Sequence, residues 1–284
     1  MTTCFISHSW CERQHDFALR LRDALRSKGI DAWVDEEQIL GGDLIRGKMR
    51  EGIMHKSDVF LLVLSPEALQ SESCLVEMNW AFEQRRNVGM QIVPVLRKEC
   101  GIPVPLQGIL YVDFRDDKNF GRAVGRLLPA IKSAAEVKWL CSHLSADEAE
   151  ERIEAARTLA KLRSRFTIPV ISHRRSVDYD PEVQYWLALA LGEIGGDEAI
   201  AALGEATGEP DPRASQGVAD ALLLLGREAL EVVLRAAMSD DPFRRRTAAR
   251  VLVDMRERDS RIKAVLARLK SDPDRRVQSV AQRA

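Results

Sequence analysis

The chain has 284 residues, of which 45% are apolar and 30% charged, a composition typical of a globular protein with one large or two ordinary domains. The formal net charge is −1, so no overall field favours nucleic acid or an anionic membrane as a partner. The longest apolar run has about six residues, far short of the ~20 that a membrane helix needs.

The N-terminus and the cysteines indicate a compartment. The first ten residues have neither a basic start nor a long apolar core, so they do not resemble a secretory signal. The five cysteines are odd in number and scattered, without a CxxC pair or a Cys/His cluster at metal spacing. We therefore expect reduced thiols, a cytoplasmic location and no bound metal.

Residues 1–135 alternate between strand and helix signals. The apolar runs predict strands at 3–8, 31–34, 58–64, 91–96 and 109–112. Between them, helices are expected at 12–28, from an N-cap at Asp43 through residue 56, at about 77–86 and at about 118–132. This alternation predicts a parallel, doubly wound sheet of the flavodoxin-like type with helices on both faces.

Glu77 has the most informative position in this first domain. The run at 58–65 is short, apolar and β-branched, as in a strand that is buried on both faces. A polar stretch follows it, so Glu77 is expected just past the carboxyl end of a central strand, at the start of a helix. Ligands bind at that edge of open α/β sheets. A carboxylate at a helix start also interacts favourably with the helix dipole, which is the simpler interpretation.

From about residue 145 the strand signal gives way to a repeat. Asp-Pro pairs recur at 180, 211, 241 and 272, and each precedes a helical stretch rich in Ala, Leu and Val. Aspartate is a good N-cap and proline fits the first helical turn, so each pair is expected to start a helix. Repetition at this period predicts an all-α solenoid over 136–284. Residues 145–178 are either a degenerate first repeat or a linker, and the last unit at Ala284 either caps the stack or stops within a repeat.

The first domain resembles a bacterial TIR (Toll/interleukin-1 receptor) domain over about residues 1–135, and the second half resembles HEAT repeats. The motifs that carry the TIR resemblance are, in chain order, Phe5-Ile-Ser-His-Ser9, Asp31-Ala-Trp-Val-Asp35, Gly42-Asp43, Leu64-Ser65-Pro66 and Ser71-x-x-Cys74-x-x-Glu77. The HEAT resemblance implies a fold and says little about the partner.

The TIR resemblance implies one of two functions. Some TIR domains cleave NAD+ at the nicotinamide–ribose bond and release nicotinamide with ADP-ribose or a cyclic isomer, and a glutamate that matches Glu77 is essential in them. Breaking that bond develops positive charge on the ribose, which a fixed carboxylate stabilises. Nicotinamide is already a cationic leaving group, so no general acid and no cofactor is needed, in contrast to the carboxylate pair of ordinary glycosidases. Other TIR domains are non-enzymatic scaffolds for protein association.

The remaining site residues follow from the same resemblance. Ser9 and Trp10 match the loop that borders the nucleotide, and Trp33 lies on the second strand, where core packing is an equal alternative. The matches to the loop that gates the pocket and contacts the next subunit are Gly42, Asp43 and Leu44. Many active relatives have a tryptophan four residues before the glutamate, whereas this chain has Ser73, with Trp80 or Trp10 as possible substitutes.

The resemblance also suggests partners and a role. We expect NAD+ as the substrate, homo-oligomers through the TIR domain, a protein or ligand trigger on the repeats, and a function in bacterial anti-phage immunity. A pocket that binds a nucleotide signal without cleaving it is a third possibility. His8 is either a base or a strand-end residue bonded to the backbone, and Cys74 is expected to pack in the core. The arginines at 244–246 and 275–276 are interpreted as a solvated face rather than a nucleic-acid site, because acidic residues flank them.

Overall fold

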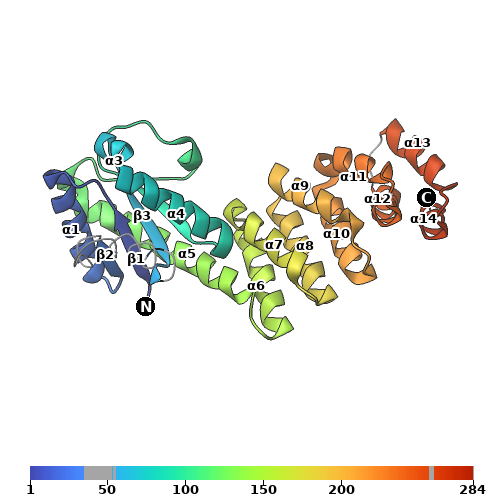
Figure 1. Ribbon diagram of the computed structural model, residues 1–284, viewed down its shortest axis with the longest axis horizontal. Coiled ribbons are helices and arrows are strands. Elements are labelled where there is room, and N and C mark those ends of the chain that lie inside the picture. Colours follow the sequence, from blue (N-terminus) through green and yellow to red (C-terminus); the bar gives the residue numbers. More distant parts are fainter. Residues whose placement is uncertain (35–52, 54–55, 256–258, 284) are drawn as a thin grey trace. The chain divides into compact units, whose positions relative to one another are not determined.

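The computed structural model describes residues 1–34, 53, 56–255 and 259–283. The chain divides into two compact units, Met1–Trp139 and Leu140–Ala284, which are described separately below. In the described part of the first unit, five parallel strands form one sheet (Figure 1). The strands are β1 (Thr3–Ser7), β2 (Asp31–Val34), β3 (Val59–Leu64), β4 (Gln91–Leu96) and β5 (Val112–Asp113). Their spatial order is β2-β1-β3-β4-β5, so the doubly wound sheet expected from the sequence is confirmed.

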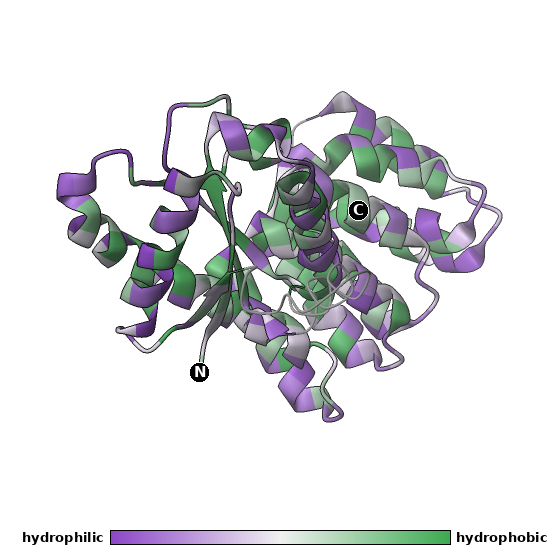
Figure 2. Cartoon of the chain, turned by 60° about the vertical axis from the view of Figure 1, so that its left-hand side comes forward, coloured by the Kyte–Doolittle hydropathy of each residue, from purple (hydrophilic) through white to green (hydrophobic). Residues whose placement is uncertain are grey.

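Helices cover both faces of this sheet. They are α1 (Glu12–Arg26), α3 (Pro66–Gln70), α4 (Glu72–Val88) and α5 (Phe120–His143). Side chains alternate along each strand, so one face packs with α1 and α5 in one apolar cluster and the other face packs with α4 in a second. Every residue of β3 is buried, as its continuous apolar run predicts. Figure 2 shows the same pattern as hydrophobic colour along the strands.

The ends of several elements differ from those expected. The polar stretch after β3 forms the short helix α3, because Ser65 caps it and Pro66 starts it. The fifth strand has only two residues, and α5 continues through Pro129 to His143, well beyond the expected end at 132. Pro94 lies within β4, where its missing N–H is tolerated because β5 pairs with only Val95 and Leu96.

The second unit is a stack of helix pairs. The pairs are α6 (Ala149–Leu162) with α7 (Ile168–Val177), α8 (Pro181–Ile194) with α9 (Asp197–Glu205), α10 (Pro212–Leu225) with α11 (Leu230–Ala237), and α12 (Pro242–Asp254) with α13 (Ser260–Leu269), followed by α14 (Arg275–Ala281). The first helices of successive pairs pack on one another, from α6 to α14, and so do the second helices. Residues 145–178, left open by the sequence, contain the helix pair α6 and α7.

Three of the four Asp-Pro pairs cap helices as expected. Asp180, Asp211 and Asp241 each accept hydrogen bonds from backbone N–H groups of the first turn. The fourth expectation is wrong, because the N-cap of α14 is Asp274 and not Asp272. Asp272 instead forms an ion pair with Arg245, so its carboxylate is engaged between helices.

Backbones approach closely between α8 and α10. A Cβ atom on Gly217 would lie 2.6 Å from the Cα atom of Tyr185, and one on Gly192 would lie 2.9 Å from the Cα atom of Ala221. Distances this short do not occur for real Cβ atoms, so glycine is required at both positions. The two glycines therefore set the spacing of this helix pair.

Candidate active site

The strand order puts the topological switch point of the sheet at the carboxyl ends of β1 and β3. The chain runs from β1 outward to β2 and then returns to β3 on the other side of β1, so the winding direction changes between these two strands. Open α/β sheets bind ligands at such a switch point. In the parallel register Ser7 pairs with Leu62, and the segments that leave this edge are Ser9–Trp10 after β1 and Ser65 after β3.

Glu77 lies on the helix that follows β3. The side chain of Ser71 caps α4 by accepting a hydrogen bond from the N–H of Cys74 (3.4 Å). Glu77 is therefore the sixth residue of the helix rather than its first, which corrects the expected helix start. Its side chain is 3% exposed, next to Met78 in the core cluster, and α4 contacts β1.

This position changes the interpretation of the glutamate. The helix dipole acts mainly within the first turn, so it does not account for a carboxylate at the sixth residue. Burying a carboxylate is costly unless other groups compensate for it, and surface glutamates avoid this penalty. The structure thus retains a buried carboxylate on α4, a helix that contacts β1, one of the two strands at the switch point.

Trp10 and His15 form an aromatic step at the end of β1. Their rings are parallel within 8° at a centroid distance of 5.5 Å, and 45% of Trp10 is exposed. Nε2 of His8 lies 2.9 Å from Nδ1 of His15, so one imidazole donates a hydrogen bond to the other. His8 and Ser9 are buried, at 3% and 4% exposure. Two roles were expected for His8, a base or a residue bonded to the backbone, and the structure shows a third, a bond to a second histidine.

Two polar residues near this edge were not predicted from the sequence. His15 supports Trp10, as described above, and Gln14 is fully buried in the first turn of α1. Within the described ranges, neither amide atom of Gln14 has a hydrogen-bond partner. A signal existed, because residue 14 shares the helical face of Phe17, Ala18 and Leu21. A polar residue on an apolar face marks a candidate site position.

The other site residues differ in what surrounds them. Trp33 packs in the core with its ring 4.5 Å from that of Phe5, and it is 9% exposed. Ser73 is half-buried, one turn before Glu77, and its hydroxyl lies 3.0 Å from that of Ser71. Trp80 packs against the core cluster that contains Trp33, so its ring is partly committed to the core. Gly42, Asp43 and Leu44 lie outside the described residues.

A second carboxylate near this edge is already paired. Glu67, in the first turn of α3, forms an ion pair with Lys98, which follows β4. The hydrogen bond from Lys98 lowers the pKa of Glu67 below its ordinary value. Glu67 is thus an ionised structural partner of Lys98, whereas Glu77 is a buried carboxylate on the next helix, α4.

The cysteines show no sign of thiol chemistry. Cys74 is 2% exposed and packs on α4. Burial raises the pKa of Cys4 far above its ordinary value and that of Cys141 to about 12. A raised pKa keeps these two thiols protonated and unreactive. All five cysteines are free.

The part of the chain that the structure describes contains no group of three or more His, Cys, Asp or Glu side chains placed to hold a metal ion. Its helices include none that is long and apolar enough to cross a membrane.

These features define a class of protein: a doubly wound parallel α/β domain with a buried glutamate on helix α4, followed by helical repeats. Residues 4–128 match the family described as TIR domain, and residues 137–223 match the family described as HEAT repeats. The chain therefore has a TIR domain at its N-terminus followed by HEAT repeats, as the sequence motifs predict.

Similar proteins of known name cover parts of the chain. A 2' cyclic ADP-D-ribose synthase from Bacteroides thetaiotaomicron is 29% identical over 94 residues, which are 33% of this chain and 32% of that protein. Deoxyhypusine hydroxylase-B from Oryza sativa subsp. japonica is 27% identical over 177 residues, 59% of each chain. The chain thus matches about a third of the length of the first relative and three fifths of the second. Among solved structures, the TIR domain of the Toll-related receptor TRR-2 from Hydra magnipapillata is 19% identical, covering 45% of this chain and 97% of that one, with a TM-score of 0.39.

Proposed function

We propose that the TIR domain cleaves NAD+ at the bond between nicotinamide and ribose, with Glu77 as the catalytic residue. The observation that carries this proposal is the burial of Glu77 on α4, a helix that contacts β1, one of the two strands at the switch point of the sheet. The TIR family match and the partial similarity to a cyclic ADP-ribose synthase support it. The HEAT match supports the repeat fold.

The chemistry requires a single carboxylate. As the C–N bond to nicotinamide breaks, its electron pair leaves with nicotinamide and positive charge develops on the ribose. A carboxylate held in a site of low dielectric stabilises that charge and orients the ribose hydroxyls. Water then attacks the ribose carbon and loses a proton, giving ADP-ribose, or a hydroxyl of the same molecule attacks and gives a cyclic isomer.

The other residues at the edge act in binding. The exposed ring of Trp10, held against His15, offers a flat surface for a nicotinamide or adenine ring. Ser9 borders the same loop, and Trp33 supports the strand from within the core. Ser73 lies where an aromatic ring would stack in related enzymes, so Trp10 takes over that role in this proposal.

Assembly regulates the activity in the same proposal. HEAT repeats offer extended surfaces for a partner, and a trigger bound there brings TIR domains of several chains together. We expect low turnover from dilute monomer and higher turnover from concentrated or cross-linked protein. A role in bacterial anti-phage defence would explain why NAD+ loss must be held back until a trigger is present.

The test compares NAD+ consumption by wild type, Glu77→Ala and the matched control Glu72→Ala. Glu72 lies in the first turn of the same helix and is exposed, so its removal changes the charge without touching the buried site. We expect Glu77→Ala to lower nicotinamide release at least about a hundredfold and Glu72→Ala to leave it unchanged. Chromatography of the second product distinguishes hydrolysis from cyclisation.

The scaffold alternative has one observation in its favour, the replacement of the aromatic ring by Ser73, whose hydroxyl is bound to Ser71. It predicts no nicotinamide release from wild type under any crowding or cross-linking condition, with unaltered self-association of Glu77→Ala. That combination of results would reject the enzymatic proposal.

A further inference from the structure

The C-terminal repeats carry a strong positive charge that the near-neutral total conceals. Residues 242–283 contain thirteen arginines and lysines, eleven of them arginine, against five acidic residues. By contrast, residues 180–211 contain eight acidic residues and no arginine or lysine. The positive charge is therefore concentrated on α12, α13 and α14 and the segments between them.

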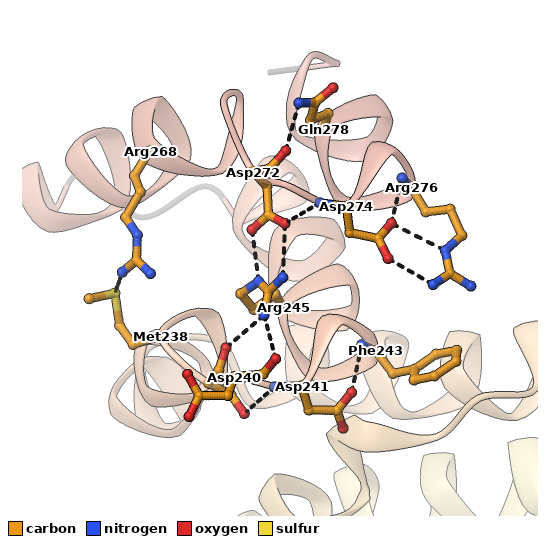
Figure 3. Close-up of polar contacts among 11 residues, drawn as sticks. Met238, Asp240, Asp241, Phe243, Arg245, Arg268, Asp272, Asp274, Arg276 and Gln278 are labelled. Carbon is orange, nitrogen blue, oxygen red and sulfur yellow. Dashed lines mark hydrogen bonds and ion pairs between the residues drawn. The ribbon is translucent and has the colours of Figure 1, made fainter.

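Acidic residues of this segment pair with some of its arginines and also cap its helices. Asp272 binds both nitrogens of the Arg245 guanidinium edge, at 2.7 and 2.9 Å (Figure 3). Asp274 caps α14 and pairs with Arg276 at 2.7 Å, and Asp259 caps α13. The flanking carboxylates, which the sequence suggested would neutralise this face, thus serve as helix caps and inter-helix ties.

Arg246 and Arg250, one turn apart on α12, are left without carboxylate partners within the described residues. The Nε atom of Arg246 and the Nη1 atom of Arg250 are buried, and in the described part of the chain they have no hydrogen-bond acceptor. Arg246 makes one long bond, from Nη2 to the carbonyl of Pro210 at 3.4 Å. Burial, together with the nearby Arg250 and Arg276, lowers the pKa of Arg246, and Asp274 and Asp211 offset this only in part.

An aromatic ring lies among these guanidinium groups. The Phe243 ring centroid is 5.5 Å from the Cζ atom of Arg246 and 5.1 Å from that of Arg276. Figure 3 shows Phe243 and Arg276 near each other on α12 and α14. Arginine side chains that stack near an aromatic ring keep their N–H groups in a fixed plane, which favours recognition of an oxyanion.

We propose that Arg246, Arg250 and Arg276, with Phe243, form a binding site for phosphate groups of a nucleic acid. We call these four residues the arginine cluster. An unpaired, partly buried guanidinium destabilises the free protein, and a phosphate oxygen supplies the missing acceptor and counter-charge. The positive charge extends over three helices, which suits a chain of phosphates better than a single small anion. The phenylalanine ring adds a surface on which a base stacks. This inference does not depend on the NAD+ chemistry of the TIR domain.

The experiment measures binding of the full chain to a fluorescently labelled single strand of about 20 nucleotides, by anisotropy over a range of salt concentrations. The test variant is Arg246→Gln with Arg250→Gln. The matched control is Arg261→Gln with Lys263→Gln, which removes the same charge from α13 in the same basic segment, outside the arginine cluster. We expect the test variant to bind roughly tenfold or more weakly and the slope of log K against log salt to fall by about two, with a clearly smaller effect in the control.

A second readout protects the result against misfolding. The oligonucleotide is expected to raise the melting temperature of the wild type and of the control, and not that of the test variant, whose own melting temperature is expected to equal or exceed that of the wild type. Equal losses in both variants would mean diffuse charge and overturn the site. Displacement by inorganic phosphate or ATP at equal phosphate concentration would overturn the nucleic-acid assignment, and so would displacement by polyglutamate. Absence of salt-dependent binding by the wild type would overturn the proposal entirely.

Discussion

Removing Arg245 tests how the last repeats are held together. Its guanidinium binds both carboxylate oxygens of Asp272 and also the carbonyls of Ser239 and Asp240, at 3.0 and 2.8 Å. The two charged side chains are only 10% and 5% exposed. We call this arrangement a clamp, because one arginine ties the loop before its own helix, α12, to the loop before α14 (Figure 3).

The expected loss of stability follows from the burial of this ion pair. Deleting one partner of a buried ion pair leaves an uncompensated charge and costs about 3–5 kcal/mol. Arg245→Ala is expected to cost an amount near the upper end of this range, because it leaves the Asp272 carboxylate without its charged partner and two carbonyls without their donor. Asp272→Asn is expected at or below the lower end, because the guanidinium keeps both carbonyl bonds. Replacing both residues by apolar ones of similar size, Arg245→Met with Asp272→Leu, is expected to be nearly neutral.

Hydrogen exchange measured by mass spectrometry on the full chain locates the effect. A loss of 3–5 kcal/mol lowers protection in α12 and α14 by between about a hundredfold and a few thousandfold, whereas the TIR domain is unaffected. The control is Arg276→Ala, which removes an exposed partner of Asp274 and leaves the cap of α14 in place. If Arg245→Ala and Arg276→Ala reduce protection equally, burial does not govern the strength of the clamp and the reasoning is refuted.

Three further outcomes are expected. The bond from Arg245 lowers the pKa of Asp272, so its contribution to stability is complete above the ordinary value near 3.8 and is lost as pH falls through the lower folded value; acid melts of Asp272→Asn should lack this component. Gly217→Ala should destabilise the stack in thermal melts, because its Cβ would overlap the backbone of α8, whereas Gly125→Ala, in an open helical site, should stabilise by ~0.4–1 kcal/mol; equal signs would contradict the close approach. Ser73→Trp should lower the KM for NAD+ by roughly fivefold or more through stacking, and an unchanged KM would place the nicotinamide elsewhere.

The architecture was largely predictable because buried strands have a recognisable apolar sequence pattern. A fully apolar β3 between charged and Ser-Pro borders indicates a central strand, and its position led directly to Glu77. The start of α4 was predicted too late in the chain. Ser65 and Ser71 cap two successive helices, α3 and α4, but the polar residues between these caps have the composition of a loop. Helix α5 was expected to end near residue 132, yet it continues to His143.

Side-chain partnerships were much harder to predict. The histidine pair joins His8, which directly follows β1, to a residue of α1 seven positions later, and no local pattern requires their rings to meet. The N-cap of α14 was assigned to Asp272 because the other Asp-Pro pairs start helices. Asp274 is also an aspartate and so an equally good N-cap residue. Only the position of Arg245 on the preceding repeat decides between them.

The clamp has a consequence for how this protein can change in length. Arg152 on α6 repeats the contacts of Arg245, binding the carbonyls of Ala146 and Asp147 and pairing with the buried Asp178 at 3.0 Å. Asp178 and Asp272 both lie two residues before the cap of the helix that follows, so they occupy equivalent positions. Excision of residues 178–271 would join Val177 to Asp272 and present the same acceptor to Arg152. Whole repeats can therefore be gained or lost between these aspartates while the arginine–aspartate contact between neighbouring repeats is kept.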